Sequence, residues 1–130
     1  MARHLAILRE PYLSRILSGV KTIESRLLRV RAAPYGCVTA GDTLLLKRAS
    51  GPIVATAQAA CVATFDNLTS ASIAALLERH AAELCLDDEM RARAQFSRYA
   101  VLIWLTDVAL IADPPVISKR DRRAWVVLES

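Results

Sequence analysis

The sequence contains no hydrophobic run long enough to cross a membrane. A spanning helix needs about 20 consecutive apolar residues, whereas the longest run here, residues 100–105, ends at Thr106 and Asp107. The N-terminus has no charged segment followed by a long apolar run and a small-residue cleavage site, so we expect no signal peptide. These absences predict a soluble, cytoplasmic protein with no membrane partner.

Cysteine is scarce, and glycine-rich phosphate-binding loops are absent. Cys37, Cys61 and Cys85 lie far apart, and no Cys-x-x-Cys or cysteine–histidine spacing is present. We therefore expect neither a disulfide framework nor a zinc site, and we interpret all three cysteines as small buried hydrophobic residues. The missing glycine-rich loop argues against an ATPase or a Rossmann enzyme. We expect no metal ion and no other cofactor.

The chain does contain enough apolar material for a core. Hydrophobic residues make up 54% of its 130 residues and charged residues 23%. This balance argues against disorder and predicts one domain over residues 1–130. The net charge is +4, and all basic residues except Lys21, Lys47 and Lys119 are arginines. The excess permits partners that carry phosphate, although a compositional bias of the genome explains it equally well.

Apolar patterns and turn residues divide the chain into short elements. We expect strands over residues 4–8, 21–31, 43–47, 53–65, 99–111 and 124–128, with a turn near Asp107. Helices are expected from Pro11 to a stop at Gly19, from a cap at Thr69 or Ser70 to residue 84, and over residues 87–95. Strands outnumber helices without regular alternation, which disfavours a doubly wound parallel sheet. The sequence therefore predicts the α+β class, as a small, mostly antiparallel β-barrel flanked by two or three helices.

Opposite charges lie close together at the start of the second expected strand. If the chain is extended from Thr22, side chains alternate between faces, and Glu24 and Arg26 share a face with Leu28 and Val30. These two charges would then point into the barrel or its mouth. Burying charge is costly unless it is paired and hydrogen-bonded. The pattern therefore indicates either a structural ion pair or the wall of a polar pocket.

The same stretch resembles a known family signature. Gly19, Lys21, Glu24 and Arg26 follow a short strand and helix with the spacing G-x-K-x-x-E-x-R. This spacing is similar to the signature of the ASCH domain family, in the PUA-like superfamily. Weaker similarities are the polar-x-Pro-aromatic opening at residues 9–12, the Gly-Asp turn at 41–42, and the closing segments 114–119 and 125–127. The resemblance covers nearly the whole chain and implies a PUA-like β-barrel with a cleft beside it.

The resemblance also implies a class of function. PUA-like barrels commonly bind RNA or modified bases, so we expect RNA, DNA or a modified nucleoside as the partner, in a polar cleft around the motif. One ASCH branch hydrolyses the acetyl amide of N4-acetylcytidine with a Lys, a Thr and a Glu, and another member is a ribonuclease. By motif, the Lys is Lys21, the Thr falls at Glu24, and Glu83 is the nearest candidate for the Glu.

The residue at position 24 distinguishes these activities. A Thr hydroxyl attacks an amide when a neutral lysine takes its proton, whereas Glu24 beside Lys21 is expected to favour the charged ammonium. We therefore predict binding first, and as the alternative a hydrolase of an acylated nucleoside, or a ribonuclease, with Lys21, Glu24 and Glu83 as catalytic residues. In that alternative Glu24 acts as general base for water. A module for a protein partner would instead show a shallow cleft and an exposed apolar patch.

Further residues are candidates for contact with the ligand. The expected ligand-binding set is Lys21, Glu24, Arg26, Tyr12, Arg9, Ser118 and Lys119. A nucleic-acid surface is expected at the basic residues Arg29, Arg31, Lys119, Arg120, Arg122 and Arg123. The alternative for these charges is a solvated turn and a strand edge protected by charge. We interpret Trp125 and His80 as packed core residues.

Overall fold

Strands and helices follow one another irregularly along the chain. The computed structural model describes residues 1–117 and 123–129. In chain order the elements are β1 (Arg3–Leu8), α1 (Tyr12–Leu17), β2 (Ile23–Leu28), β3 (Thr43–Arg48), β4 (Ile53–Phe65), α2 (Ser70–Arg79), α3 (Ala81–Leu84), α4 (Asp88–Ala94), β5 (Tyr99–Leu110) and β6 (Trp125–Glu129). Within the described ranges, no helix has the length and apolar character of a membrane span.

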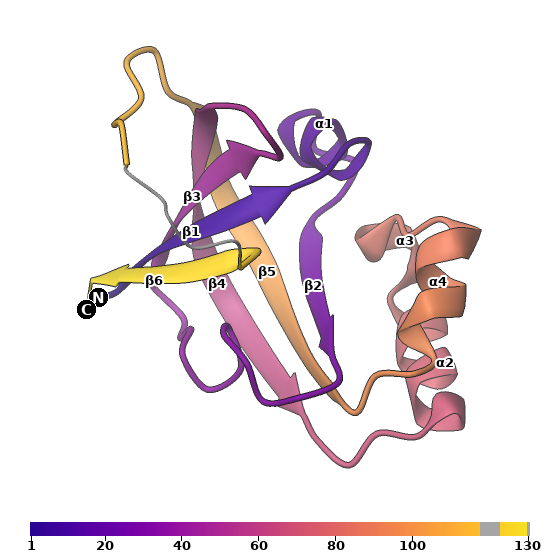
Figure 1. Ribbon diagram of the computed structural model, residues 1–130. Coiled ribbons are helices and arrows are strands. Elements are labelled where there is room, and N and C mark those ends of the chain that lie inside the picture. The colour runs from indigo at the N-terminus through magenta and orange to yellow at the C-terminus, as the bar shows by residue number, and fades with distance from the viewer. Residues whose placement is uncertain (118–122, 130) are drawn as a thin grey trace.

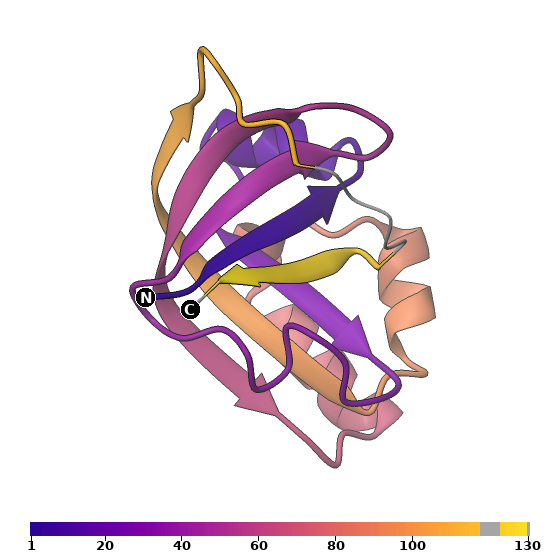
Figure 2. The same ribbon diagram turned by 60° about the vertical axis from the view of Figure 1, so that its left-hand side comes forward.

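The strands form a single curled sheet in the order β2-β5-β4-β3-β1-β6. β1 and β3 are parallel, and all other neighbours are antiparallel. The sheet curves into a half-barrel (Figure 1, Figure 2), with β2 and β6 as its edge strands. The predicted mostly antiparallel α+β architecture is confirmed. The two ends of the chain lie side by side because β1 pairs with β6.

The long antiparallel pair β4–β5 forms the middle of the sheet. Burial along β4 alternates with period two, so that Ala55, Ala57 and Ala59 are buried. Opposite Ala57, β5 has two residues, Asp107 and Val108, and the register shifts at this point. Asp107 has a φ of 52°. The turn expected near Asp107 is therefore a bulge within a continuous strand, because a bulge takes up one extra residue without ending the pairing.

A hydrophobic core fills the inner face of the curled sheet. Leu13 and Ile16 of α1 pack there with Val101 and Ile103 of β5 and with Trp125 of β6. The buried alanines of β4 belong to the same cluster, and their small side chains leave room for the larger ones at the packing density of a protein interior. The core position expected for Trp125 is confirmed.

The remaining helices cover the outer face of β2 and β5 (Figure 1). Ile73 and Leu77 of α2 and Leu84 of α3 pack against Ile23 of β2 and Leu102 of β5. Ile73 and Leu77 are four residues apart and so lie on one face of α2, which packs on the sheet, and Leu84 of α3 joins the same cluster. The half-barrel is thus covered on its inner side by α1 and on its outer side by α2, α3 and α4.

The helix expected to run to residue 84 is divided. Thr69 caps it as expected, since its hydroxyl accepts a hydrogen bond from Ser72 N at 3.1 Å. α2 ends before His80, however, and α3 is a separate short turn. The His80 ring packs edge-on against Trp104 with 5.6 Å between ring centroids. The described residues contain four helices, where two or three were predicted. The extra helix arises because His80, which packs on Trp104, has non-helical backbone angles.

A buried chain of polar side chains fixes β6 to β1. His4 Nε2 lies 2.8 Å from Asp42 Oδ2, and Trp125 Nε1 donates to His4 Nδ1 at 3.0 Å. Because Nδ1 accepts from the indole, Nε2 carries the proton and donates to Asp42. Asp42 also accepts hydrogen bonds from the backbone N–H groups of Ala2 and Thr39, both at 3.0 Å. β1, β6 and the turn before β3 are thereby held together.

The cysteines are less buried than predicted. Cys37 and Cys61 are exposed and Cys85 is half-buried, and all three are free thiols. The expectation of three buried hydrophobic cysteines is therefore wrong. For Cys61 the reason is a register shift after Ala59 that ends the alternation of buried positions on β4.

We expect Asp42→Asn to destabilise the fold. Burial raises the pKa of Asp42, but the hydrogen bonds from His4, Thr39 and Ala2 outweigh it and hold the pKa below its usual value of 3.8. Such a carboxyl stabilises the fold above its unfolded pKa, and this contribution is lost as the pH falls through the folded pKa. Urea unfolding at neutral pH should show a loss of about 1–3 kcal/mol in the free energy of unfolding.

The pH dependence supplies the second readout of this substitution. Below about pH 4, the stability of the wild-type protein should fall more steeply than that of the variant. Asp113→Asn, at an exposed position, is the matched control. Equal stability of the two variants at neutral pH would contradict a role for Asp42.

Candidate functional site

The alternation of β2 brings the charged motif to the inner face. In the β2–β5 pairing, Glu24 lies opposite Ile103 and Arg26 opposite Val101, both of which belong to the inner core. Ile23 faces the outer core instead. The prediction that Glu24 and Arg26 share the inner face is therefore confirmed.

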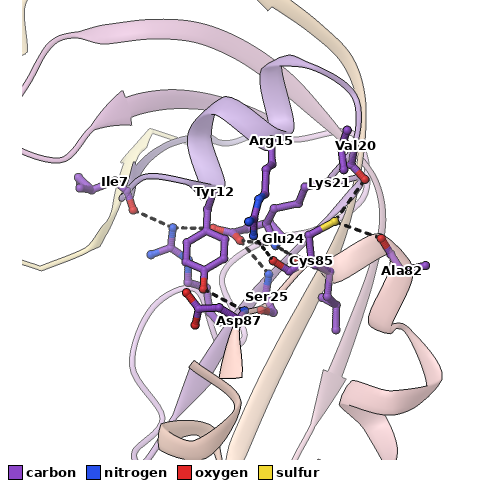
Figure 3. Close-up of polar contacts among 12 residues, drawn as sticks. Ile7, Tyr12, Arg15, Val20, Lys21, Glu24, Ser25, Ala82, Cys85 and Asp87 are labelled. Carbon is purple, nitrogen blue, oxygen red and sulfur yellow. Dashed lines mark hydrogen bonds and ion pairs between the residues drawn. The ribbon is translucent and has the colours of Figure 1, made fainter. Parts of the chain in front are cut away.

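Glu24 is the centre of a buried charged cluster beside α1 (Figure 3). Its Oε2 accepts from Arg26 Nη2 at 2.9 Å, and its Oε1 accepts from Ser25 N at 3.0 Å and lies 3.5 Å from Lys21 Nζ. Only 6% of Glu24 is exposed. Both carboxylate oxygens are thus engaged with donors.

Arg26 bridges the open seam of the half-barrel, which we define as the gap between edge strand β2 and the Ile7–Ala124 end of the β1–β6 pair. Its Nη2 donates to Ile7 O at 2.9 Å, and its Nη1 donates to Ala124 O at 3.2 Å. The guanidinium lies over the Trp125 ring at 5.1 Å. Arg26 Nε is buried and has no hydrogen-bond partner among the described residues.

Lys21 is buried because α1 ends abruptly before it. Gly19 has a φ of +85°, which a glycine adopts without strain, and Lys21 N donates to Arg15 O at 2.9 Å. The ammonium group then donates to Leu84 O of α3 at 2.6 Å and lies 5.5 Å from the centroid of the Tyr12 ring. Lys21 therefore joins β2, α1 and α3.

Burial, and not the neighbouring carboxylate, determines the direction in which the pKa of Lys21 shifts. Burial lowers the pKa of Lys21 below its usual value of 10.5, and this effect outweighs the Glu24 carboxylate, which raises it. Glu24 favours the ammonium form, as expected, but the net shift of the Lys21 pKa is downward. The reason is that nearly complete desolvation penalises the charged form.

Three residues that the sequence analysis did not name as site residues complete the surroundings. Arg15 Nη1 donates to Cys85 O at 2.8 Å, and Asp87 N lies 3.5 Å from the Tyr12 hydroxyl, as Figure 3 shows. Burial raises the pKa of Tyr12. Cys85 has a φ of 53° at the end of α3, and nothing in the local sequence signals that conformation. Only the packing of α1 against the α3–α4 junction brings these residues together.

Glu83 does not join the cluster through its carboxylate. Its side chain is exposed, and it meets β2 only through its backbone carbonyl, which accepts from Thr22 N at 3.0 Å. Within residues 1–117 and 123–129, Glu24 is the only carboxylate within 4 Å of Lys21 Nζ. The same part of the chain has no Ser or Thr hydroxyl that hydrogen-bonds to Lys21 or Glu24. The convergence of Lys21, Glu24 and Glu83 is therefore not found.

The remaining candidates lie at the surface or outside the described residues. Arg9 and Arg123 are exposed. Arg29 and Arg31 are also exposed and lie over the aromatic rings of Phe96 and of Tyr99, respectively. Four candidates, Ser118, Lys119, Arg120 and Arg122, lie outside the described residues. In the part of the chain that the structure describes, no group of His, Cys, Asp and Glu has the arrangement of a metal site.

Comparison with known proteins supports this architecture. No family model and no curated protein matches the sequence. Among solved structures, the ASCH protein from Zymomonas mobilis is similar over 98% of this chain and 87% of its own, with a TM-score of 0.73 at 15% identity. The chain has the ASCH fold.

Two substituted forms of the same Zymomonas mobilis protein are similar to a comparable degree. Their TM-scores are 0.72 and 0.70, at 17% and 16% identity, over 98% of this chain and 88% and 90% of theirs. The signature at residues 19–26 begins just after α1 and continues into β2. Its resemblance to the ASCH signature agrees with the ASCH fold of this chain.

We expect Glu24→Gln to lower the pKa of Lys21 further. The carboxylate is the main group that opposes the effect of burial, so its removal leaves desolvation unopposed. The pH dependence of the lysine ¹³Cε chemical shifts reports this titration, and Lys21→Met identifies the Lys21 signal. Glu78→Gln, on the exposed side of α2, should leave it unchanged. An unchanged or raised Lys21 pKa in Glu24→Gln would contradict the pairing.

We expect Arg26→Gln to be strongly destabilising. The substitution leaves Glu24 buried with one partner fewer and removes the donors that bridge the seam. Breaking a buried pair by removing one partner costs roughly 3 kcal/mol or more. Urea unfolding measures the loss, with Arg79→Gln at an exposed position of α2 as control.

A double substitution separates pairing from simple burial at the seam. Replacement of both charges, as Glu24→Leu with Arg26→Leu, should recover part of the stability in a Lys21→Met background, because no uncompensated buried charge then remains. A double variant less stable than Arg26→Gln in the same background would show that the bridge to Ile7 O and Ala124 O, rather than the pair, dominates.

Proposed function

We propose that residues 1–130 form a single ASCH-type domain that binds RNA or a modified nucleoside at the seam. The observation that carries the proposal is the buried Lys21–Glu24–Arg26 cluster on the inner face of β2, directly beside the gap between the two sheet edges. The ASCH fold supports the same class of partner, because PUA-like barrels commonly bind RNA.

The energetics of the cluster favour a role beyond stability. Apolar residues of similar volume often replace a buried ion pair at no loss of stability, so burial alone gives no reason to keep three charges there. The buried Nε of Arg26 lacks an acceptor among the described residues. An unsatisfied buried donor costs about 1–3 kcal/mol. A phosphate or carbonyl oxygen of a ligand at the seam would satisfy it.

Each charged residue takes a defined part in this proposal. Arg26 offers its unpartnered Nε to a phosphate or base carbonyl, because Nη1 and Nη2 already donate within the protein. Glu24 orients Arg26 and Lys21 through the contacts at 2.9 and 3.5 Å and accepts a base amine. The ring of Tyr12, which is 9% exposed, has its centroid 5.5 Å from Lys21 Nζ. Arg9 precedes α1 and is exposed, and it contributes positive charge at the surface.

Hydrolysis of an acylated nucleoside is the second candidate. The lowered pKa of Lys21 favours hydrolysis. At a given pH more of the lysine is then neutral, and only the neutral amine can act as a general base. Two features weigh against it: no hydroxyl nucleophile contacts Lys21 in the described part of the chain, and Glu83 points to solvent. Ribonuclease activity would need the same general base. We therefore rank binding ahead of both reactions.

Fluorescence anisotropy with a labelled single-stranded RNA tests the proposal. We expect an affinity that falls with added salt, because phosphate binding releases counterions. Lys21→Met should weaken binding about tenfold, because it removes the charged partner of Glu24, which orients Arg26, whereas Arg79→Ala on exposed α2 should not. Circular dichroism confirms that each variant is folded. An affinity insensitive to both salt and Lys21→Met would contradict the proposal.

Incubation with N4-acetylcytidine separates binding from hydrolysis in the same preparations. Chromatography should detect no release of cytidine from the wild-type protein. Turnover that disappears in Lys21→Met would instead make the protein an amidohydrolase and give Lys21 a chemical role.

A further inference from the structure

A concave surface lies away from the seam, where α2 and α4 meet the start of β5. A pocket of about 430 Å³, open to solvent, lies there. It is lined by Leu68, Thr69, Ser70, Gln95, Phe96 and Arg98. The lining combines one aromatic ring, one cation and several neutral polar groups, and it contains no acidic residue.

Phe96 is the unusual member of this lining. It is 54% exposed, although large aromatic side chains are normally well buried. The guanidinium of Arg29, from the chain just after β2, lies 5.5 Å from the centroid of its ring. An exposed ring beside an arginine is the arrangement on which unpaired nucleobases stack.

The backbone that carries Phe96 and Arg98 is held in place from two sides. Arg98 N donates to Leu28 O at 2.8 Å, and Arg98 O accepts from Leu68 N at 3.0 Å. Ser97, between the two, is buried and donates from its N–H to Ala94 O at 2.9 Å. The backbone positions from which the ring and the cation project are therefore fixed before any ligand binds, which lowers the entropic cost of binding.

A second arginine close to Arg29 in the chain also lies over aromatic rings. Arg31 lies over the Tyr99 ring at 5.4 Å and over the Tyr35 ring at 6.0 Å, two residues along the chain from Arg29. Arg29, Arg31 and Arg98 are all exposed. Cations interleaved with aromatic rings match the alternation of phosphates and bases in a single strand.

We propose that this cavity is a nucleotide subsite, in which a base of a single-stranded nucleic acid stacks on Phe96 and its phosphate contacts Arg29 and Arg98. The amide of Gln95 and the hydroxyl of Ser70 face the same space and contact the edge of the base. The identity of the partner rests on the proposed function. Arg29 follows Arg26 by three residues and lies just after the end of β2.

Adenosine 5′-monophosphate, titrated into ¹⁵N-labelled protein, tests the subsite without reference to the seam. We expect amide shifts at residues 68–70 and 95–98. Phe96→Ala should weaken binding about tenfold, within the range measured for loss of one base-stacking ring, and Phe96→Tyr should restore it. Leu110→Ala, at an exposed apolar position of β5, is the matched control. Shifts that are absent, or unaffected by Phe96→Ala, would overturn the subsite.

A labelled oligonucleotide distinguishes failure of the subsite from failure of the proposed function. Under the inference, Phe96→Ala weakens binding of single-stranded RNA, and a duplex of the same sequence, whose bases cannot stack on the ring, binds less tightly. RNA binding that depends on Lys21 but not on Phe96 would overturn the subsite and leave the seam proposal standing. Monophosphate shifts at residues 95–98 without any effect of Lys21→Met on RNA would retain the subsite and overturn the seam proposal.

Discussion

The bridge that Arg26 makes across the seam is the contact on which the half-barrel depends. A curled sheet with two free edges leaves backbone groups without strand partners, and here one guanidinium reaches from β2 to Ile7 O and Ala124 O at the end of the opposite edge. Arg26 is held in that position by Glu24 at 2.9 Å and by the Trp125 ring. Trp125 in turn is fixed by His4 and Asp42. The inner core, both sheet edges and the buried network therefore meet at one side chain.

The same constraint determines the chemistry of the cluster. Because the seam is closed by side chains and not by backbone pairing, charged groups are present in the interior of the half-barrel, and Lys21 is desolvated beside them. Desolvation lowers the pKa of Lys21, and the carboxylate that opposes it has both oxygens engaged. Such a site is suited to hold a polar ligand through donors. It has no hydroxyl nucleophile in contact with Lys21 within the described residues, which is why binding ranks ahead of hydrolysis.

Expectations from local pattern were accurate where periodicity alone decides the outcome. The alternation of β2 correctly assigned Glu24 and Arg26 to one face, because a strand has a period of two whatever it packs against. The same kind of pattern failed for Cys61, where a register shift changes the face, and for the long second helix, where packing of His80 on Trp104 breaks the turn. The sequence analysis assigned Glu83 to the cluster only because of its position in the chain. In the structure its side chain is exposed to solvent.

The sequence by itself determined the α+β class, most of the strands and the clustering of Lys21, Glu24 and Arg26, since spacing and alternation are local properties. It also carried the resemblance that the ASCH fold bears out. Only the tertiary structure decided that Arg26 bridges the sheet edges and that burial outweighs Glu24 at Lys21. It alone brought Phe96, Arg29 and Arg98 beside one cavity. Those facts depend on which distant segments meet and on how much water they exclude, and no local pattern encodes either.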